Sequence, residues 1–219
     1  MIKLYSYFRS SAAFRVRIAL HYKGLKHEII PIHLLKEGGE HLKSDFKKLN
    51  PQGLVPVLVS DDGEVISQSM SILEYLEEMN PTPSLLPTSH VERSYVRTLA
   101  NMVVCDIHPL NNLRVLRYLK HELKLEDESK NKWITHWIHH GFQAIESTLA
   151  QSGASLPYCL GDTPTFADVC LIPQVYNALR NQCKMDAFPT IQKIYENCMK
   201  LEAFKKAAPE NQIDYEQTP

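Results

Sequence analysis

The stretch IKLYSYFRSSAAFRVRIALHYKGLKHEIIPI, residues 2–32, decides the fold. Its first part, residues 2–7, predicts a short strand, and residues 12–23 predict a helix because their apolar positions group on one side. Gly24 suits the end of that helix, and residues 27–32 carry enough β-branched side chains for a second strand. A strand, a helix and a strand in this order predict a parallel pair joined by the helix.

A hairpin and another helix follow. Residues 57–59 and 64–66 favour strands, and they flank the turn sequence DDG at 61–63, which predicts an antiparallel pair. Residues 70–79 predict a helix with one apolar stripe, and Pro81 ends it. The resulting order, βαβ-ββα, is that of a thioredoxin-like domain.

The second half of the chain has a different pattern. Residues 81–87 contain three prolines and predict an extended linker. Beyond it, apolar residues recur at helical spacing. We therefore expect an α/β plus all-α protein, with a thioredoxin-like domain at 1–80, a linker at 81–87 and a helical-bundle domain at 88–219.

Composition and charge exclude several classes of protein. The 219 residues include 24 Lys and Arg against 25 Asp and Glu, so the net charge of −1 argues against a nucleic-acid partner. Neither a membrane span nor the apolar core of a signal peptide is evident. The cysteines are odd in number and none forms a Cys-x-x-Cys pair, which favours a reducing, cytoplasmic setting over a disulfide framework: Cys105, Cys159, Cys170, Cys183 and Cys198.

Ser10 and Ser11 lie where the first helix begins. A helix N-terminus carries unpaired N–H groups and a partial positive charge, and it can lower the pKa of a nearby thiol. Either hydroxyl could donate to a thiolate held there, although simple N-capping is the more frequent role of such a pair. A dithiol redox role is excluded at this position, because the chain has Ser-Ser-Ala-Ala at 10–13.

Two further segments fit a peptide-like ligand. Val55-Pro56 precedes the third strand, and pattern alone favours a trans bond. In a thioredoxin-like domain, a cis bond would turn the Val55 backbone outward to pair with a ligand like an added strand. Gln68-Ser69 opens the next helix, where a serine can cap and where a carboxylate can bind.

Two other patterns favour structure over chemistry. Thr165 and Asp168 have the spacing of a capping box, which predicts a stabilised helix start. His136, His139 and His140 have a helical spacing that can bind zinc. No carboxylate completes an H-E-x-x-H motif and tryptophans flank the group, so we expect no metal.

Four segments together resemble zeta-class glutathione transferases, the maleylacetoacetate isomerases and the related bacterial maleylpyruvate isomerases. The resemblance runs nearly end to end, and its most specific part is the first of these segments: YFRSSAAFRVRIAL at 7–20, NPQGLVPVL at 50–58, ISQSMSILEYL at 66–76 and CDIHPLNNLRVL at 105–116.

This resemblance implies a homodimer, with glutathione as cofactor and a small dicarboxylate as substrate. It implies that Val55-Pro56 is cis and pairs with the cysteinyl backbone of glutathione. Gln68 and Ser69 are implied to hold the γ-glutamyl end. His41 is a weaker candidate for the glycine end.

The implied reaction is a cis–trans isomerisation by reversible addition of the glutathione thiolate, in tyrosine and phenylalanine breakdown. Ser10, Ser11 and Arg9 are the expected catalytic residues. The substrate carboxylates and oxygen are expected to contact a set of cations and polar neighbours, although a surface ion pair is the commoner role of a single arginine: Arg9, His108, Asn112, Arg114 and Arg180. Ala12 stands where the family commonly has cysteine, so behaviour that depends on a protein thiol there is in doubt.

Four alternatives remain open. The substrate could be the maleylpyruvate of gentisate breakdown, which is also a cis-enone dianion. A general glutathione-conjugating transferase would need the same thiolate site but no dicarboxylate clamp. A non-enzymatic adaptor could share the fold. A glutathione-linked disulfide reductase is least favoured, because no cysteine lies near the first helix.

Overall fold

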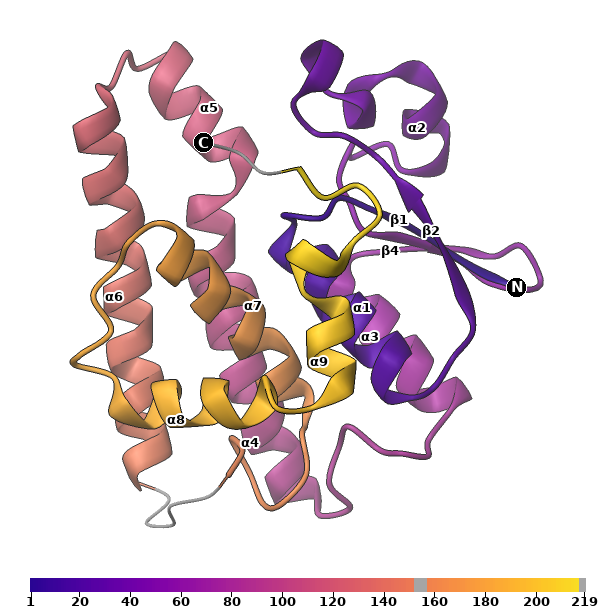
Figure 1. Cartoon of the computed structure of the whole chain (residues 1–219), viewed down its shortest axis with the longest axis vertical. Coiled ribbons are helices and arrows are strands. Elements are labelled where there is room, and N and C mark those ends of the chain that lie inside the picture. Colours follow the sequence, from indigo (N-terminus) through magenta and orange to yellow (C-terminus); the bar gives the residue numbers. More distant parts are fainter. Residues whose placement is uncertain (152–156, 217–219) are drawn as a thin grey trace. The chain divides into compact units, whose positions relative to one another are not determined.

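The computed structural model describes residues 1–151 and 157–216 (Figure 1). The chain forms two compact units, Met1–Leu85 with Met199–Pro219, and Leu86–Cys198. These bounds differ from the expected ones at the C-terminus, which the sequence pattern assigned to the helical domain. The difference arises from packing between distant segments, because the last helix lies against the first.

The first unit contains a four-stranded sheet in the order β2-β1-β3-β4. β1 and β2 are parallel, whereas β3 is antiparallel to both β1 and β4. The parallel pair and the hairpin predicted from sequence are therefore confirmed. The elements of this part are β1 (Ile2–Ser6), α1 (Ser11–Tyr22), β2 (His27–Pro31), α2 (Ser44–Leu49), β3 (Val57–Val59), β4 (Val65–Ser67) and α3 (Ser69–Met79).

Alternation along β1 separates the two faces of the sheet. Leu4 is fully buried in the core, together with Leu58 of β3 and the apolar stripes of α1 and α3. Tyr5 points to the opposite face, where its ring meets Phe46 of α2 edge-on at 6.2 Å between ring centroids. The thioredoxin-like arrangement thus places the beginnings of α1 and α3 on a rigid base.

The C-terminal segment returns to this unit. Helix α9 (Glu202–Ala207) lies beside α1 (Figure 1). The Arg17 guanidinium of α1 is completely buried and donates from Nε to the carbonyl oxygen of Ala207 at 2.9 Å. Because a short amphipathic helix carries no signal of which domain it packs on, the sequence could not assign α9 to the first unit.

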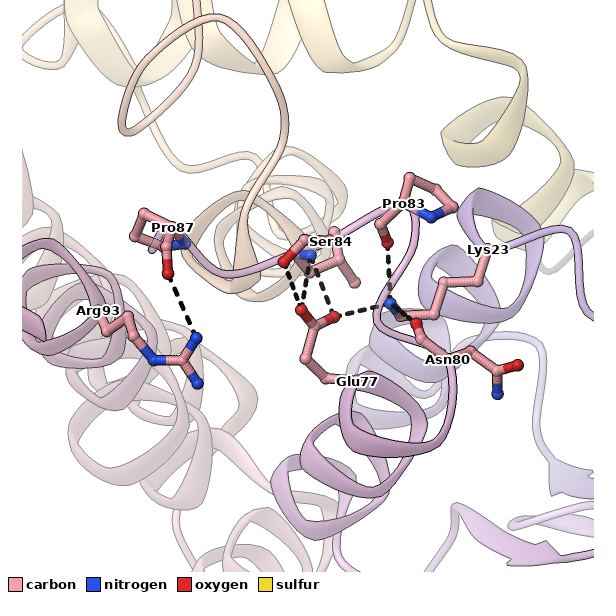
Figure 2. A network of polar contacts seen from close by, with 8 residues as sticks. Lys23, Glu77, Asn80, Pro83, Ser84, Pro87 and Arg93 are labelled. Atoms are coloured by element: carbon pink, nitrogen blue, oxygen red, sulfur yellow. Dashed lines mark hydrogen bonds and ion pairs between the residues drawn. The ribbon is translucent and has the colours of Figure 1, made fainter. Parts of the chain in front are cut away.

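A buried ion pair anchors the proline-rich segment that follows α3. The Lys23 ammonium pairs with the Glu77 carboxylate at 2.7 Å and donates to the carbonyl oxygens of Asn80 and Pro83 (Figure 2). The Glu77 carboxylate in turn accepts from the Leu85 N–H at 3.0 Å. Removing one partner of a buried pair leaves the other charge uncompensated, so substitution of either Lys23 or Glu77 alone would destabilise the attachment of this segment to α1 and α3.

The second unit is helical throughout its main elements. Its longest helix is α6, and α8 runs across α6 and α7 (Figure 1). Helix α7 is buried along most of its length, and its start has the predicted capping box of Thr165 and Asp168. Besides the π-helix Met102–Ile107, the main elements are α4 (His90–Asn101), α5 (Leu113–His121), α6 (Asp127–Gln151), α7 (Phe166–Arg180) and α8 (Pro189–Cys198).

The π-helix is a feature that the sequence pattern did not predict. It lies against α6 at Gly141, where an added Cβ would stand 2.3 Å from Cγ1 and Cδ1 of Ile107. A side chain at position 141 would therefore push the π-helix away from α6. Within residues 1–151 and 157–216, no helix is both long enough and apolar enough to cross a bilayer.

Candidate functional site

Ser10 begins α1 as its N-cap. Its Oγ accepts a hydrogen bond from the Ala13 N–H at 3.2 Å, and its own N–H donates to the Tyr7 carbonyl at 2.9 Å. The capping role is therefore confirmed. A serine hydroxyl has two acceptor positions and one hydrogen, so capping leaves the hydrogen able to donate to an anion. Ser11 is the first helical residue and is 8% exposed.

Arg9 lies directly before this serine pair. Its guanidinium carbon stands 5.3 Å from the ring centroid of Phe8, which is a cation–π distance. Phe8 itself is buried. The half-buried Arg9 side chain is thus held near the start of α1 by an aromatic face.

Polar side chains also gather at the start of α3, in the same unit. Ser69 is the first residue of the helix, is 5% exposed, and accepts from Nη1 of Arg15 at 3.1 Å. Gln68 is exposed with a φ of 70°, and its Nε2 donates to Oε1 of Gln52 at 2.6 Å. A helix N-terminus beside a buried guanidinium is a favourable place for a carboxylate.

Arg15 and Arg17 of α1 are both fully buried, although the sequence pattern gave neither of them a role. Arg17 holds the backbone before α1, and Arg15 joins α1 to the start of α3. The available signal was their position inside the apolar run AFRVRIAL, where a solvent-facing side of the helix is hard to find.

The Val55-Pro56 peptide bond is cis, as the family resemblance implied, and the preference for trans from pattern alone was wrong. Val55 is half-buried and Pro56 is buried directly before β3. The preceding loop is tied by the Asn50 side chain, whose Nδ2 donates to the Leu54 carbonyl at 2.8 Å. This places Val55 at the end of an ordered loop.

His41 is held in a short 3-10 turn, Glu40–Leu42. The side chain is 6% exposed, and its ring lies so close to Gly39 that a Cβ there would stand 2.5 Å from Cε1. Only a small part of the ring faces solvent. Contact with the glycine end of glutathione stays a prediction for this residue.

The other candidates belong to the second unit. His108 is half-buried and opens the 3-10 turn that follows the π-helix. Asn112 caps α5, where its Oδ1 accepts from the Arg114 N–H at 3.2 Å, and the Arg114 side chain is exposed. His108, Asn112 and Arg114 thus lie in one short segment. Arg180 is on a different helix, exposed at the end of α7.

The three histidines of α6 do not share one face. The rings of His136 and His140 stack at 6.2 Å, whereas the His139 ring meets Phe188 edge-on at 5.4 Å. In the part of the chain that the structure describes, no three or more His, Cys, Asp or Glu side chains are grouped so as to hold a metal ion.

The cysteines are all in the second unit, and most are buried. Burial, together with the nearby Asp168 carboxylate, raises the pKa of the Cys159 and Cys198 thiols. Burial also raises the pKa of Asp168 itself, although N–H donors from Cys159 and Thr165 oppose the shift. Such buried thiols are poor nucleophiles.

Comparison with known proteins decides the family. The chain matches the family models of the glutathione S-transferase N-terminal domain over residues 9–79 and C-terminal domain over 111–207. A solved bacterial maleylpyruvate isomerase, described as a zeta-class glutathione transferase, is 45% identical, with a TM-score of 0.94 over 98% of this chain and 100% of that one. This chain belongs to the zeta class of glutathione transferases.

Relatives of this zeta-class chain are similar over almost their whole length. A probable maleylacetoacetate isomerase of Vibrio cholerae is 49% identical, covering 96% of this chain and 97% of that protein. A maleylpyruvate isomerase of Ralstonia is 47% identical, covering 97% and 99%. The maleylacetoacetate isomerase of Methylobacterium extorquens, solved with malonate and glutathione, is 36% identical with a TM-score of 0.93 and coverage of 98% and 100%.

Proposed function

We propose that this protein uses glutathione to convert maleylacetoacetate to fumarylacetoacetate by cis–trans isomerisation. The observation that carries the proposal is the 49% identity to a probable maleylacetoacetate isomerase across nearly both chains. The geometry of the first unit supports it, because a serine hydroxyl caps α1 and a buried guanidinium stands beside the start of α3.

Glutathione is the cofactor of this chemistry: when bound, it would supply a thiolate able to add reversibly to the double bond, so that the bond could rotate as a single bond before the thiolate leaves. Ser10 donates its hydroxyl hydrogen to the sulfur, and the partial positive charge at the start of α1 favours the ionised form. Ser11 adds a second hydroxyl at the same helix start. These residues lower the pKa of the thiol so that it reacts near neutral pH.

The remaining parts of the cofactor fit the polar groups around it. The γ-glutamyl carboxylate binds at the N-terminus of α3, contacted by Gln68 and Ser69 and favoured by the charge of Arg15. The cysteinyl backbone pairs with the backbone of Val55, before Pro56. His41 contacts the glycine end.

Arginine suits the two carboxylates of the substrate, because its planar fork binds a carboxylate through two hydrogen bonds. We assign this role to Arg9, Arg114 and Arg180. His108 and Asn112 are polar neighbours that can donate to the ketone oxygen, where negative charge develops during the reaction. A solved relative with bound malonate and glutathione supports a site for a small dicarboxylate.

A first experiment measures isomerisation of maleylacetoacetate with and without glutathione. We expect conversion only with glutathione, and an unchanged rate in its absence would rule out the mechanism. Parallel assays with neutral halogenated or epoxide electrophiles separate an isomerase from a general conjugating transferase. Failure to bind immobilised glutathione would instead favour a non-enzymatic adaptor with this fold.

Maleylpyruvate is the second candidate substrate, because a solved maleylpyruvate isomerase superposes with a TM-score of 0.94. Both molecules are cis-enone dianions and differ in length. A side-by-side comparison of kcat/KM for the two substrates decides between aromatic amino-acid breakdown and gentisate breakdown.

We further propose that the enzyme acts in the cytoplasm as a homodimer. Within the described residues no cysteine forms a disulfide, and Cys105 is exposed, which suits a reducing compartment. Family membership supports the dimer. Light scattering of the purified protein tests it: a mass near twice 25.1 kDa is expected, and a mass of one chain would contradict it.

A further inference from the structure

The turn Tyr7–Ser10 carries the proposed thiolate-binding hydroxyl, and its backbone groups have unusual partners. The Phe8 N–H donates to Oδ2 of Asp214 at 2.9 Å, although the two residues are 206 positions apart. On the other side of the same residue, the Phe8 carbonyl accepts from Nη2 of buried Arg17 at 2.9 Å. The turn is thus held by a carboxylate and a guanidinium, one on each side.

The ring of Phe8 is held as well. It is 1% exposed and meets the ring of Tyr215 edge-on, with 5.7 Å between the centroids. The guanidinium of Arg9 stands over the same ring. Two successive residues of the C-terminal tail, Asp214 and Tyr215, therefore contact the residue that lies two positions before Ser10.

The tail is itself fixed to the first unit at the next residue. Glu216 forms an ion pair with Lys36, and its Oε2 lies 3.6 Å from Nε2 of His33. Nδ1 of His33 accepts from the Leu35 and Lys36 N–H groups at 3.1 and 2.8 Å, which leaves the ring hydrogen on Nε2, facing the carboxylate. The His33 ring also meets the Tyr7 ring edge-on at 5.0 Å.

These contacts converge on one segment, and they extend the proposed function rather than repeat it. We propose that Asp214, with Tyr215, is a positioning clamp that holds the Phe8 peptide and so fixes Ser10 for hydrogen bonding to the glutathione thiolate. The clamp acts through the backbone: Asp214 orients Phe8, and the hydrogen bond between the Ser10 N–H and the Tyr7 carbonyl closes the turn. Hydrogen bonds to an ionised acceptor are stronger than neutral ones, so a carboxylate is well suited to this task.

Glu216 contributes less, because its ion pair with Lys36 is exposed and exposed pairs add little. The decisive contact is therefore the one from Asp214 to the Phe8 N–H. If Asp214 contributes more than Glu216, the specific contact with Phe8 holds the turn, rather than attachment of the tail in general.

The test compares Asp214→Ala and Asp214→Asn with the wild type, and uses Ile213→Ala as a matched control. Ile213 is the neighbouring tail residue and its side chain is 77% exposed. Three quantities are measured: amide hydrogen exchange at Phe8 without ligand, the pKa of the bound glutathione thiol from its thiolate absorbance, and kcat/KM for isomerisation.

Asp214→Ala is expected to speed exchange at Phe8 by about tenfold and to raise the bound thiol pKa by roughly half a unit or more. Asp214→Asn keeps an acceptor oxygen and is expected to restore most of the protection of Phe8. Glu216→Gln and Ile213→Ala are expected to change each quantity by less than about twofold.

Unchanged exchange at Phe8 in Asp214→Ala would overturn the proposal. So would faster exchange with an unchanged thiol pKa, because the clamp would then order the turn without affecting the thiolate. An effect of Glu216→Gln equal to that of Asp214→Ala would assign the role to tail tethering instead. Should the wild type bind glutathione but not isomerise the substrate, the proposed function fails while exchange and thiol pKa still decide the clamp.

Discussion

The Ser69 hydroxyl accepts a hydrogen bond from the buried guanidinium of Arg15 at 3.1 Å. This contact joins the N-terminal turn of α3 to the middle of α1, so the two helix starts proposed to hold glutathione are linked through one side chain. This hydrogen bond is costly to break, because the buried Arg15 guanidinium would lose one of its acceptors.

Ser69→Ala should therefore affect both stability and cofactor binding. We expect a loss of about 1.5–3 kcal/mol in the free energy of unfolding, since a hydrogen bond to a buried charged group is removed. Glutathione affinity should fall by about tenfold or more. Urea unfolding and calorimetric titration measure the two effects. Ser71→Ala, an exposed position in the same helix, is the control, and equal losses in both variants would contradict the assignment.

Ser10 has two roles that substitutions can separate. Ser10→Ala should cost about 1 kcal/mol of stability through the lost cap, whereas Ser10→Gly should cost only a few tenths. Both remove the hydroxyl, so both should raise the pKa of the bound glutathione thiol and lower kcat. Ser89 caps α4 in the same manner, accepting from the Glu92 N–H. Ser89→Ala should reproduce the loss of stability without the fall in kcat. An equal fall in kcat in Ser89→Ala would attribute the effect of Ser10→Ala on kcat to lost capping rather than to the thiolate.

Arg180 is expected to bind a substrate carboxylate. Arg180→Met should raise KM for the dianionic substrate by about tenfold, which corresponds to the loss of one charge-assisted contact of roughly 1.4 kcal/mol. A neutral electrophile should be almost unaffected. Lys184→Met removes an exposed cation shortly after the same helix and serves as the control. Equal changes in KM for charged and neutral substrates would remove Arg180 from the site.

Gly141 allows the π-helix before His108 to approach α6. Gly141→Ala places a Cβ 2.3 Å from two carbons of Ile107, so we expect a loss of about 1–3 kcal/mol from overpacking. A displaced π-helix should also raise KM through His108. The double variant Ile107→Ala with Gly141→Ala removes the clash, so its KM should be lower than that of Gly141→Ala alone. If adding Ile107→Ala raises KM further, the clash with Ile107 is not the cause of the raised KM in Gly141→Ala.

His21 should make the protein less stable in acid. Burial lowers the pKa of His21 to about 4, and the neighbouring charges of His27, Lys206 and Arg17 act in the same direction. Between pH 6.5 and about 4 the unfolded chain binds a proton that the folded chain does not, so stability falls as the pH is lowered through this range. Because the ring is only half-buried, we expect the loss to be about 1–2 kcal/mol.

Urea unfolding at about pH 7 and about pH 4.5 measures this loss. His21→Gln should remove most of the difference between the two conditions and leave stability at neutral pH nearly unchanged. His121→Gln, an exposed histidine at the end of α5, should keep the wild-type difference. A pH dependence that persists in His21→Gln would assign it to other groups.

The sequence alone determined the local features of this protein. The strand–helix–strand order of residues 2–32, the cap at Ser10 and the capping box of Thr165 and Asp168 were predicted and are confirmed. Each depends on hydrogen bonds and side-chain spacing within a few residues, which the order of residue types records directly. The family resemblance added the cis bond before Pro56, which residue pattern alone did not favour.

Tertiary structure decided where the chain ends pack and which charges are buried. Arg17 meets Ala207 across 190 positions, and Asp214 meets Phe8 across 206. The π-helix before His108 likewise depends on its approach to Gly141. Such contacts depend on which distant surfaces are complementary in shape and charge, and a residue's neighbours in sequence carry little of that information. The hydroxyls proposed to bind glutathione were thus predictable, whereas the buried charges that hold them in place were not.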